Sequence, residues 1–255
     1  MNKRLSIYVS SPDSYADVFS VFLKGFRKYW SNCPYEFILT TNTQKYEGIN
    51  CICNGNESDT WVSRTIAAFP EIKSKYILLM CDDLIISDDV DNGQIEQILD
   101  YMDNHNINFC RLNPLDIGNR IDELPLLRNV NKRTPYAVNL QIGIFNTEFF
   151  KKLLGTGEMS AWDIEKAIND EASVAKDEYF EDVVAVSKYV IPYIHGVYKG
   201  MWKRLSVKKI IKRGIGINIQ RPYVPLKLEL KIFLIGWLQY KISPGLRLFF
   251  KRFIR

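Results

Sequence analysis

A short apolar run that ends in two adjacent carboxylates constrains the fold of this chain more than any other stretch. Residues 76–80 read YILLM, and Cys81, Asp82 and Asp83 follow directly. A run of about five apolar residues between polar flanks is typical of a strand buried on both faces, and such strands occur mainly in parallel sheets covered by helices. In an open α/β sheet, ligands bind at the carboxyl ends of these strands. The pattern therefore predicts that Asp82 and Asp83 lie at a binding crevice.

Two neighbouring carboxylates at a strand end offer oxygen ligands of the kind that Mg²⁺ or Mn²⁺ takes when it binds a substrate diphosphate. The structural alternative is that an aspartate merely caps a turn, since many strands end in Asp. Asp82 and Asp83 by themselves are compatible with both interpretations.

Strand and helix patterns alternate around this run, as in an α/β fold. The expected elements are a strand over 5–9, a helix over 15–30, a strand over 35–40, a short strand over 50–53, a helix from 58 to 69, the strand over 76–80, a helix around 95–102 and a strand over 107–112. The opening strand, helix and strand favour a parallel sheet with a right-handed crossover.

The second half of the globular part has a looser pattern. Residues 113–140 predict loops and short strands, and later elements are a strand over 139–146, helices over 148–154 and 160–172, and a strand and turn over 190–200. At 255 residues with 47% hydrophobic content, the chain is long enough to bury a sizeable core.

Charge is distributed unevenly along the chain. Residues 1–198 hold 19 Lys and Arg against 28 Asp and Glu, whereas residues 199–255 hold 15 against one. Such a split predicts an acidic globular body and a basic tail that binds a polyanion or an anionic membrane.

The tail over residues 203–255 interleaves basic and apolar side chains at helical spacing. This pattern is typical of an amphipathic helix pair in a membrane interface, interrupted at residues 243–245. The alternative is a helix packed on the protein's own core. No nucleic-acid motif is present, and phosphate binding would leave the apolar face unexplained, so nucleic acid is not an expected partner. The members of the pattern are Lys208, Lys209, Lys212, Arg213, Arg247, Lys251 and Arg252, with Phe233, Leu234, Trp237, Leu238, Leu246, Phe249, Phe250 and Phe253.

Cysteine usage and hydropathy indicate the cellular compartment in which the chain works. The five cysteines have neither the spacing of a zinc site nor that of a disulfide framework, which indicates unpaired thiols in a reducing cytoplasm. No signal peptide is expected, and the longest apolar candidate for a membrane span, residues 232–240, is far shorter than the roughly 20 residues a span requires.

Five segments occur in an order that resembles bacterial GT-A-type glycosyltransferases, in particular enzymes of capsule, O-antigen or other surface-polysaccharide assembly. The segments are residues 10–15, 61–64, 76–83, 141–145 and 162–165. The resemblance covers roughly residues 5–205. It implies a GT-A (Rossmann-like) fold: an α/β, mixed and mostly parallel sheet flanked by helices, followed here by the basic amphipathic tail. The expected catalytic domain is 1–202, with a nucleotide-sugar half over 1–112 and an acceptor half over 113–202.

The resemblance also implies a set of donor-binding residues. A nucleoside diphosphate leaving group gains negative charge during transfer, so a divalent cation or basic side chains must stabilise it. The expected donor-binding residues are Ser10, Asp13, Thr41, Asn42, Trp61, Arg64, Asp82, Asp83 and Lys199, and the expected ligands of Mg²⁺ or Mn²⁺ are Asp83, Asp82 and His195. The alternatives are turn and capping roles for the residues after the first two strands, a solvated position for Arg64 and a structural hydrogen bond for His195.

Acceptor-side residues follow from the same resemblance. An inverting transfer needs a base for the acceptor hydroxyl, and Glu165 is the expected base with Asp163 as its rival. Trp162 and Gln141 are expected to bind the acceptor. The alternative for both acids is a helix amino terminus, where negative charge is favourable. Cys81 stands where the family often has the first carboxylate of its acidic motif; because hard cations prefer oxygen, Cys81 is expected to pack, and the need for a metal stays open.

The sequence therefore predicts an inverting glycosyltransferase that moves a sugar from a nucleotide sugar to a lipid-linked or polysaccharide acceptor in bacterial surface-glycan synthesis. Its expected location is cytoplasmic and peripheral, on the inner face of the cell membrane, with the tail on anionic lipid. One alternative is a nucleotidyltransferase acting on sugar phosphates, although Ser10, Ser11 and Pro12 are not the Gly-rich loop that such an enzyme would place after the first strand. The other is a non-catalytic peripheral membrane-binding protein.

Overall fold

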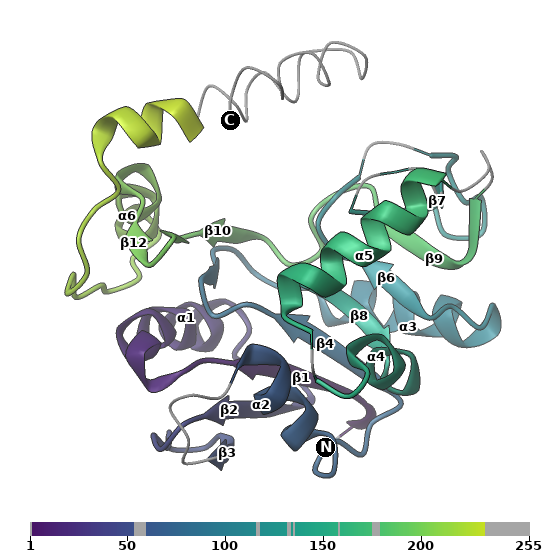
Figure 1. The fold of residues 1–255 in the computed structure, drawn as a ribbon, viewed down its shortest axis with the longest axis horizontal. Coiled ribbons are helices and arrows are strands. Elements are labelled where there is room, and N and C mark those ends of the chain that lie inside the picture. Colours follow the sequence, from purple (N-terminus) through teal and green to yellow (C-terminus); the bar gives the residue numbers. More distant parts are fainter. Residues whose placement is uncertain are drawn as a thin grey trace. The chain divides into compact units, whose positions relative to one another are not determined.

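The computed structural model describes residues 2–53, 60–115, 118–131, 134, 136–157, 159–174 and 179–232. Contacts divide the chain into two compact units, Met1–Ile194 and His195–Arg255, and each is described by itself. Figure 1 shows the fold with colours that follow the sequence.

The first unit alternates strands and helices through most of its length, as the sequence predicts. Its elements are β1 (Asn2–Ser10), the 3₁₀ turn η1 (Asp13–Tyr15), α1 (Ala16–Tyr29), β2 (Tyr35–Thr41), β3 (Asn50–Cys53), α2 (Trp61–Ala68), β4 (Tyr76–Met80), β5 (Leu84–Ile86), α3 (Asn92–Asn104), β6 (Phe109–Arg111), β7 (Leu127–Asn131), β8 (Ile142–Asn146), α4 (Thr147–Leu154), α5 (Ala161–Val174) and β9 (Tyr179–Val186). The strand β10 (Tyr193–His195) reaches the boundary with the second unit.

Eight strands of the described chain form one sheet in the order β3-β2-β1-β4-β8-β6-β9-β7. The first four strands in this order are parallel, and β6 is parallel to β9. β8 runs antiparallel to both of its neighbours, and β7 runs antiparallel to β9. This is the mixed, mostly parallel sheet that the sequence predicts. Because β8 is reversed, its amino end lies at the same edge as the carboxyl ends of β1, β2 and β4.

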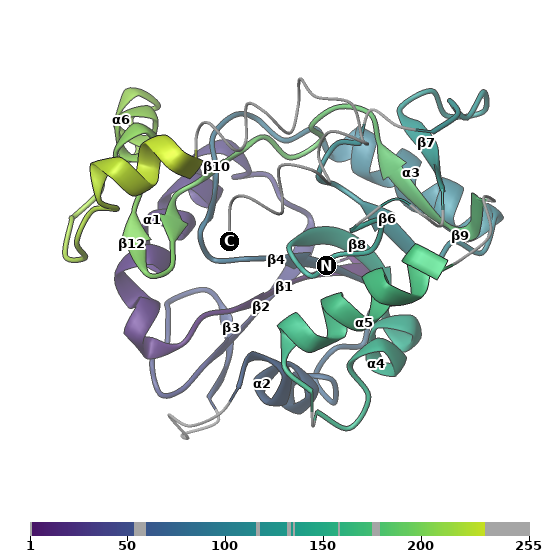
Figure 2. The same ribbon diagram turned by 45° about the horizontal axis from the view of Figure 1, so that its top comes forward.

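Helices cover both faces of the sheet (Figures 1 and 2). On one face, α2, α4 and α5 supply Val62, Phe150 and Ile164 to a core that includes Ile77 and Leu79 of β4. On the other face, aromatic rings of α1 pack against Phe37 of β2. Every residue of β4 is buried, which confirms the interpretation of the apolar run as a central strand.

Local sequence explains where several helices begin and end. The Thr60 side chain accepts a hydrogen bond from the Ser63 N–H at the start of α2, and Asn146 accepts two at the start of α4. Ser, Thr and Asn are preferred at this position because they satisfy amide groups that lack an intrahelical partner. After α4, Gly155 has a φ of 58°, a conformation that glycine adopts at little cost.

Two strands were not predicted from the sequence. β5 is only three residues long and follows the acidic turn at once. β9 contains Glu181 and Asp182, and these charges interrupt its apolar pattern. This segment forms a strand because it pairs with β6 and β7, which are remote in sequence.

The second unit begins with a small hairpin of β11 (Val197–Tyr198) and β12 (Met201–Trp202). Lys199 and Gly200 form its turn, and both have positive φ values, as a type I′ hairpin turn requires. α6 (Arg204–Lys212) and a helical stretch over 226–232 follow.

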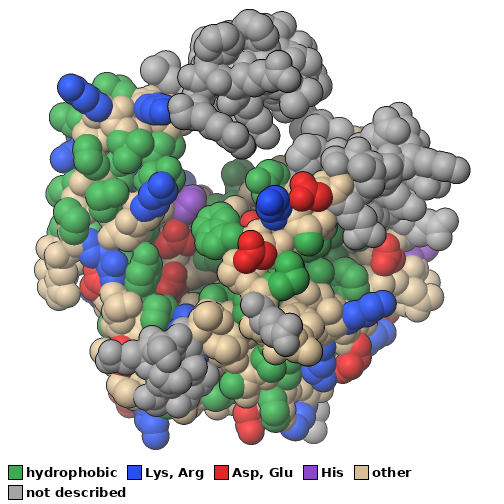
Figure 3. Space-filling model, viewed as in Figure 1, with side chains coloured by type: hydrophobic (Ala, Val, Ile, Leu, Met, Phe, Trp, Pro, Cys, Tyr) green, Lys and Arg blue, Asp and Glu red, His purple; other side chains and the backbone are tan. Residues whose placement is uncertain are grey.

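Figure 3 shows basic and apolar side chains side by side on the second unit, at the upper left of the picture. The predicted tail pattern beyond residue 232 lies outside the described residues. Within the part that is described, no helix is long and apolar enough to cross a membrane.

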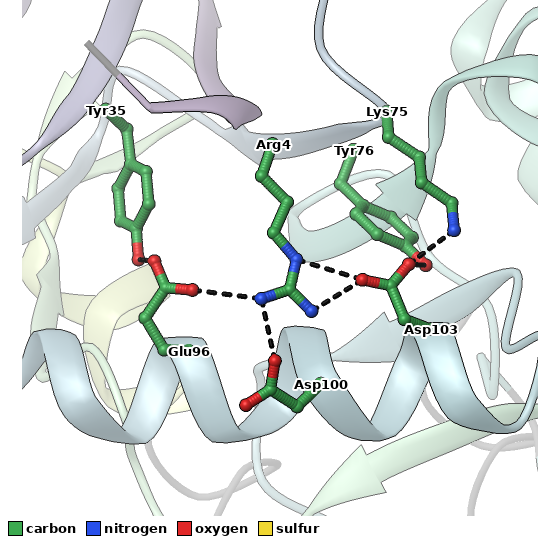
Figure 4. Close-up of polar contacts among 7 residues, drawn as sticks. All are labelled: Arg4, Tyr35, Lys75, Tyr76, Glu96, Asp100 and Asp103. Atoms are coloured by element: carbon green, nitrogen blue, oxygen red, sulfur yellow. Dashed lines mark hydrogen bonds and ion pairs between the residues drawn. The ribbon is translucent and has the colours of Figure 1, made fainter.

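A polar network attaches α3 to the amino ends of three strands (Figure 4). Arg4 of β1 forms ion pairs with Glu96, Asp100 and Asp103 of α3. The Tyr35 hydroxyl donates to Glu96 over 2.7 Å, and the Tyr76 hydroxyl donates to Asp103 over 2.8 Å. The network lies at the edge of the sheet opposite to the carboxyl ends of β1 and β4.

Candidate active site

The carboxyl ends of β1, β2 and β4 and the amino end of β8 bring polar residues to one edge of the sheet. Strand pairing places Ser10 beside Thr40, Val9 beside Met80, and Met80 beside Ile142. Residues that come just after β1, β2 and β4, or just before β8, therefore gather at this edge, as expected for an α/β sheet. They are Ser11, Thr41, Asn42, Cys81, Asp82, Asp83 and Gln141.

Asp82 and Asp83 occupy the central positions of a turn that joins β4 to β5, since the Leu84 N–H donates to the Cys81 carbonyl over 3.1 Å. The Ser11 hydroxyl donates to Asp82 Oδ2 over 2.6 Å, and Asp82 is 9% exposed. Asp83 is more exposed than Asp82. Asp82 and Asp83 therefore form a turn, as the structural alternative predicts. The Asp82 carboxylate also accepts a hydrogen bond from Ser11, which follows β1.

Cys81 lies between the acidic turn and the start of β8. Its thiol donates to the Gln141 carbonyl over 3.4 Å, at the start of β8. Burial raises the pKa of the Cys81 thiol well above its ordinary value, and the charges of Asp83, Asp82 and Glu165 raise it further. The thiol is therefore protonated at neutral pH and packs against the backbone, whereas a metal ligand would need the thiolate.

Glu165 of α5 reaches the same edge. Its Oε1 accepts a hydrogen bond from the Leu140 N–H over 2.7 Å, just before β8, and the residue is 8% exposed. One oxygen therefore holds the segment that leads into β8. The Cys81 thiol lies 3.7 Å from the Leu140 carbonyl, and Glu165 binds the N–H of the same residue, so the acidic turn and the Glu165 carboxylate meet at one segment.

Asp163 and Trp162 lie at the exposed start of α5. The Ser160 hydroxyl donates to Asp163 Oδ2 over 2.6 Å, and the Asp163 N–H donates to Ser160 Oγ over 3.2 Å. This reciprocal pair is a capping arrangement, so Asp163 has the helix-start role that the sequence left open. Trp162 is 81% exposed, which leaves its ring accessible to a ligand.

Arg64 of α2 is buried, with 5% of its surface exposed, so the solvated alternative is wrong. Its Nε donates to Ser10 Oγ over 3.2 Å at the end of β1. Next to it, the Tyr8 hydroxyl is within 2.9 Å of Thr40 Oγ1 and donates to Thr65. Burial raises the pKa of Tyr8, so its hydroxyl stays neutral. A guanidinium here places a fixed positive charge behind the carboxyl end of β1.

Asp13 joins the loops after β1 and β2. Its carboxylate accepts hydrogen bonds from the backbone N–H groups of Asn42, Thr43 and Gln44, and its own N–H donates to Asn42 Oδ1 over 3.0 Å. Burial opposes ionisation, but the hydrogen bonds from Thr43, Gln44 and Asn42 outweigh it and lower the pKa of Asp13. Its carboxylate is thus ionised and organises the loop. Thr41 takes part through its hydroxyl, which donates to the Gln44 carbonyl.

Four more of the predicted site residues have the following positions. Trp61 lies in the first turn of α2, one turn before Arg64. Gln141 is exposed at the start of β8, and its N–H donates to Asn139 Oδ1 over 3.0 Å. His195 and Lys199 belong to the second unit, and their part in donor or metal binding stays a prediction.

The acidic residues fit a metal site that substrate phosphates complete better than one in which the protein supplies all the ligands. In the described ranges, no group of three or more His, Cys, Asp or Glu side chains is arranged to hold a metal ion. Mg²⁺ usually keeps several waters and takes one or two carboxylates together with substrate phosphates. Asp83 and Asp82 are the two carboxylates that such a shared cation would take, and the protonated thiol of Cys81 would not be a ligand.

Two residues at this edge were not predicted from the sequence. The sequence predicts only a turn at Ser11, yet its hydroxyl binds Asp82. Arg111 ends β6 and is 9% exposed; its Nε donates to the Asn113 carbonyl over 2.9 Å. The sequence signal that could have identified Arg111 is the one that identified Asp82: a charged residue at the end of an apolar strand.

The sequence matches no protein-family model and no curated protein sequence. TarS from S. aureus is similar at 11% identity and a TM-score of 0.47, over 95% of this chain and 44% of that chain. A mannosyltransferase from Pyrobaculum calidifontis, in complex with GDP-Man and Mn²⁺, is similar at 9% identity and a TM-score of 0.47, over 78% and 58%.

A third similar structure is CMP:2-keto-3-deoxy-manno-octonic acid synthetase complexed with CTP, at 10% identity and a TM-score of 0.45, over 76% of this chain and 92% of that chain. This chain spans less than half of TarS and little more than half of the mannosyltransferase. At identities this low, function has to be inferred from the residues of this chain itself.

Proposed function

We propose that this chain is an inverting glycosyltransferase that transfers a sugar from a nucleotide-sugar donor to a hydroxyl of a lipid-linked or polysaccharide acceptor. The observation that carries the proposal is that the Asp82–Asp83 turn and Glu165 meet at the segment before β8: the Cys81 thiol contacts the Leu140 and Gln141 carbonyls, and Glu165 binds the Leu140 N–H. Buried Arg64 at the neighbouring end of β1 supplies a positive charge. Acids for a cation, a base and a guanidinium are the groups that glycosyl transfer from a diphosphate needs.

The donor diphosphate is proposed to lie along the ends of β1 and β4. A divalent cation, when bound by Asp83 and Asp82, would offset the negative charge that develops on the leaving group. Ser11 orients the Asp82 carboxylate, and Arg64 adds a charge that needs no proton transfer because a guanidinium stays protonated. The loop that Asp13 organises with Asn42 is proposed to hold the nucleoside.

Glu165 is proposed as the base. The acceptor oxygen forms a bond to the anomeric carbon as the bond from that carbon to the diphosphate oxygen breaks, and the hydroxyl proton passes to the Glu165 carboxylate. The hydrogen bond from the Leu140 N–H to Oε1 fixes the orientation of the carboxylate, so Oε2 is the oxygen that takes the proton. Exposed Trp162 on the same helix is proposed to stack on the acceptor sugar.

The experiment is a thermal-shift screen of the full chain against nucleotide sugars, with and without Mn²⁺ or Mg²⁺, followed by an assay for nucleoside diphosphate release with the ligands that stabilise. A ligand of the native state raises the melting temperature. Stabilisation by a nucleotide sugar, lost in Asp83→Asn, is expected. Stabilisation by a nucleoside triphosphate with pyrophosphate release on adding a sugar phosphate would instead identify a nucleotidyltransferase. No response to any nucleotide would contradict both.

A further inference from the structure

The second unit carries a large excess of positive charge, whereas the rest of the chain is net acidic. Residues 195–255 hold 15 Lys and Arg and a single acid, Glu229. The proposed sugar transfer assigns a use to none of the basic residues in α6 or the helical stretch over 226–232. Their role therefore has to be sought outside the active site.

Glu229 is engaged inside the second unit. Its Oε1 accepts from the Leu205 N–H over 3.3 Å, and its Oε2 lies 3.7 Å from Arg204 Nη1. Only 13% of the Glu229 side chain is exposed. These contacts join the start of α6 to the helical stretch over 226–232, and they pair the only acid of the unit with Arg204.

The two helices expose lysine and large apolar side chains together. In α6, Val207 and Ile210 are buried, while Leu205 and Ile211 are 54% and 58% exposed. Lys208, Lys209 and Lys212 are also exposed on this helix. A lysine face that served solubility alone would not need leucine and isoleucine beside it, because exposing them to water is unfavourable.

The helical stretch over 226–232 repeats the same combination. Leu226 and Leu230 are 62% and 61% exposed, and Lys227 and Lys231 follow them directly and are exposed as well. Residues four apart lie on the same side of a helix, so the two leucines form one apolar stripe with lysines along it. The Leu-Lys surface is defined here as Leu205, Lys208, Lys209, Lys212, Leu226, Lys227, Leu230 and Lys231.

We propose that the Leu-Lys surface docks on a bilayer that contains anionic lipid. A helix that presents leucines between lysines can bury the leucines at the level of the acyl chains and keep the ammonium groups among the phosphates. Nucleic acid would pair with the lysines but would leave the leucines in water. An anionic bilayer satisfies both groups at once, and this docking does not depend on the proposed sugar transfer.

The proposal is tested by co-sedimentation of the full chain with vesicles of phosphatidylcholine, with and without phosphatidylglycerol. Binding is expected only with phosphatidylglycerol, and it should weaken as salt rises. Each lysine is expected to contribute about fivefold in affinity, so Lys208→Gln, Lys209→Gln and Lys212→Gln together should weaken binding by about 100-fold. The matched control replaces three exposed lysines of the first unit, Lys24→Gln, Lys152→Gln and Lys166→Gln, and should bind as the parent does.

The leucines separate a bilayer from a nucleic acid. Leu226→Gln and Leu230→Gln together should lower vesicle affinity by about tenfold or more and leave any binding of a single-stranded RNA oligonucleotide unchanged. All these side chains are exposed, so circular dichroism should show a native fold in each variant. Unchanged vesicle binding in the leucine variant, equal binding to both kinds of vesicle, or RNA that binds more tightly than vesicles would each overturn the proposal.

Discussion

The Ser11 hydroxyl donates a 2.6 Å hydrogen bond to Asp82 Oδ2, across 71 residues of chain. It joins the turn after β1 to the turn after β4, at the edge where several of the predicted donor-binding residues lie. This hydrogen bond restricts the rotation of the Asp82 carboxylate. Asp83, which is more exposed, is the carboxylate better placed to meet a ligand from solvent.

Asp83→Asn is therefore expected to lower the rate of sugar transfer by about 100-fold or more, with little change in the melting temperature. An amide keeps the shape of the side chain but loses the charge that a cation requires. Transfer rate and thermal melting measured together check this. Asp89→Asn, an exposed aspartate six residues on, is the control and should leave both quantities unchanged. Full activity in Asp83→Asn would remove the metal-site assignment.

Glu165→Gln is expected to lower turnover by about 100-fold or more while donor affinity stays within a few-fold, because only the proton-accepting step is lost. The glutamine carbonyl can still accept from the Leu140 N–H, so the fold should persist. Asp163→Asn is the matched comparison on the same helix, since Asp163 pairs with Ser160 at the helix start. Kinetics on both variants decide between them: a large loss in Asp163→Asn with normal turnover in Glu165→Gln would make Asp163 the base.

Arg64→Lys is expected to weaken nucleotide-sugar binding by about tenfold or more, because lysine keeps the charge but loses the planar fork and the Nε hydrogen bond to Ser10. Titration calorimetry with the donor found in the screen measures this directly. Arg27→Lys, on the exposed side of α1, serves as the control. Equal donor affinity in the parent and in Arg64→Lys would show that the guanidinium is purely structural.

Asp103 gives a stability prediction with a defined pH dependence. Burial opposes ionisation of Asp103, but hydrogen bonds from Lys75, Tyr76 and Arg4 outweigh it and lower the pKa of its carboxyl. The contribution to stability is therefore fully present above the unfolded-state pKa, about 4, and is lost as the pH falls through the lower folded-state pKa.

Asp103→Asn should therefore lower the free energy of unfolding by roughly 0.5–1 kcal/mol at neutral pH, a size typical of partly exposed ion pairs, and by progressively less as the solution becomes more acidic. Urea titrations at several pH values measure both effects. Asp100→Asn is the control, since Asp100 is 64% exposed and pairs with Arg4 alone in the network of Figure 4. A loss in Asp103→Asn that is the same at all pH values would contradict the ionic origin of the effect.

Local sequence determined most of the elements. The apolar run before Cys81 predicted a buried central strand, and all of β4 is buried. The alternation of strand and helix patterns predicted the mixed α/β sheet, because periodicity and helix-start residues act over a few neighbouring positions. β9 was missed because charged Glu181 and Asp182 obscure its pattern and its pairing partners lie far away in the chain.

Tertiary structure decided what the polar residues meet. Sequence alone placed Asp82, Glu165 and Arg64 on separate elements, and it could not show that Glu165 binds the Leu140 N–H or that Arg64 is buried against Ser10. Nor could it show that Ser11 holds Asp82. Hydrogen bonds between residues tens of positions apart depend on strand order and register, which arise only when the whole sheet assembles. The sequence by itself thus determined which residues follow the strands and begin the helices, and the assembled sheet decided which of them meet and what they bind.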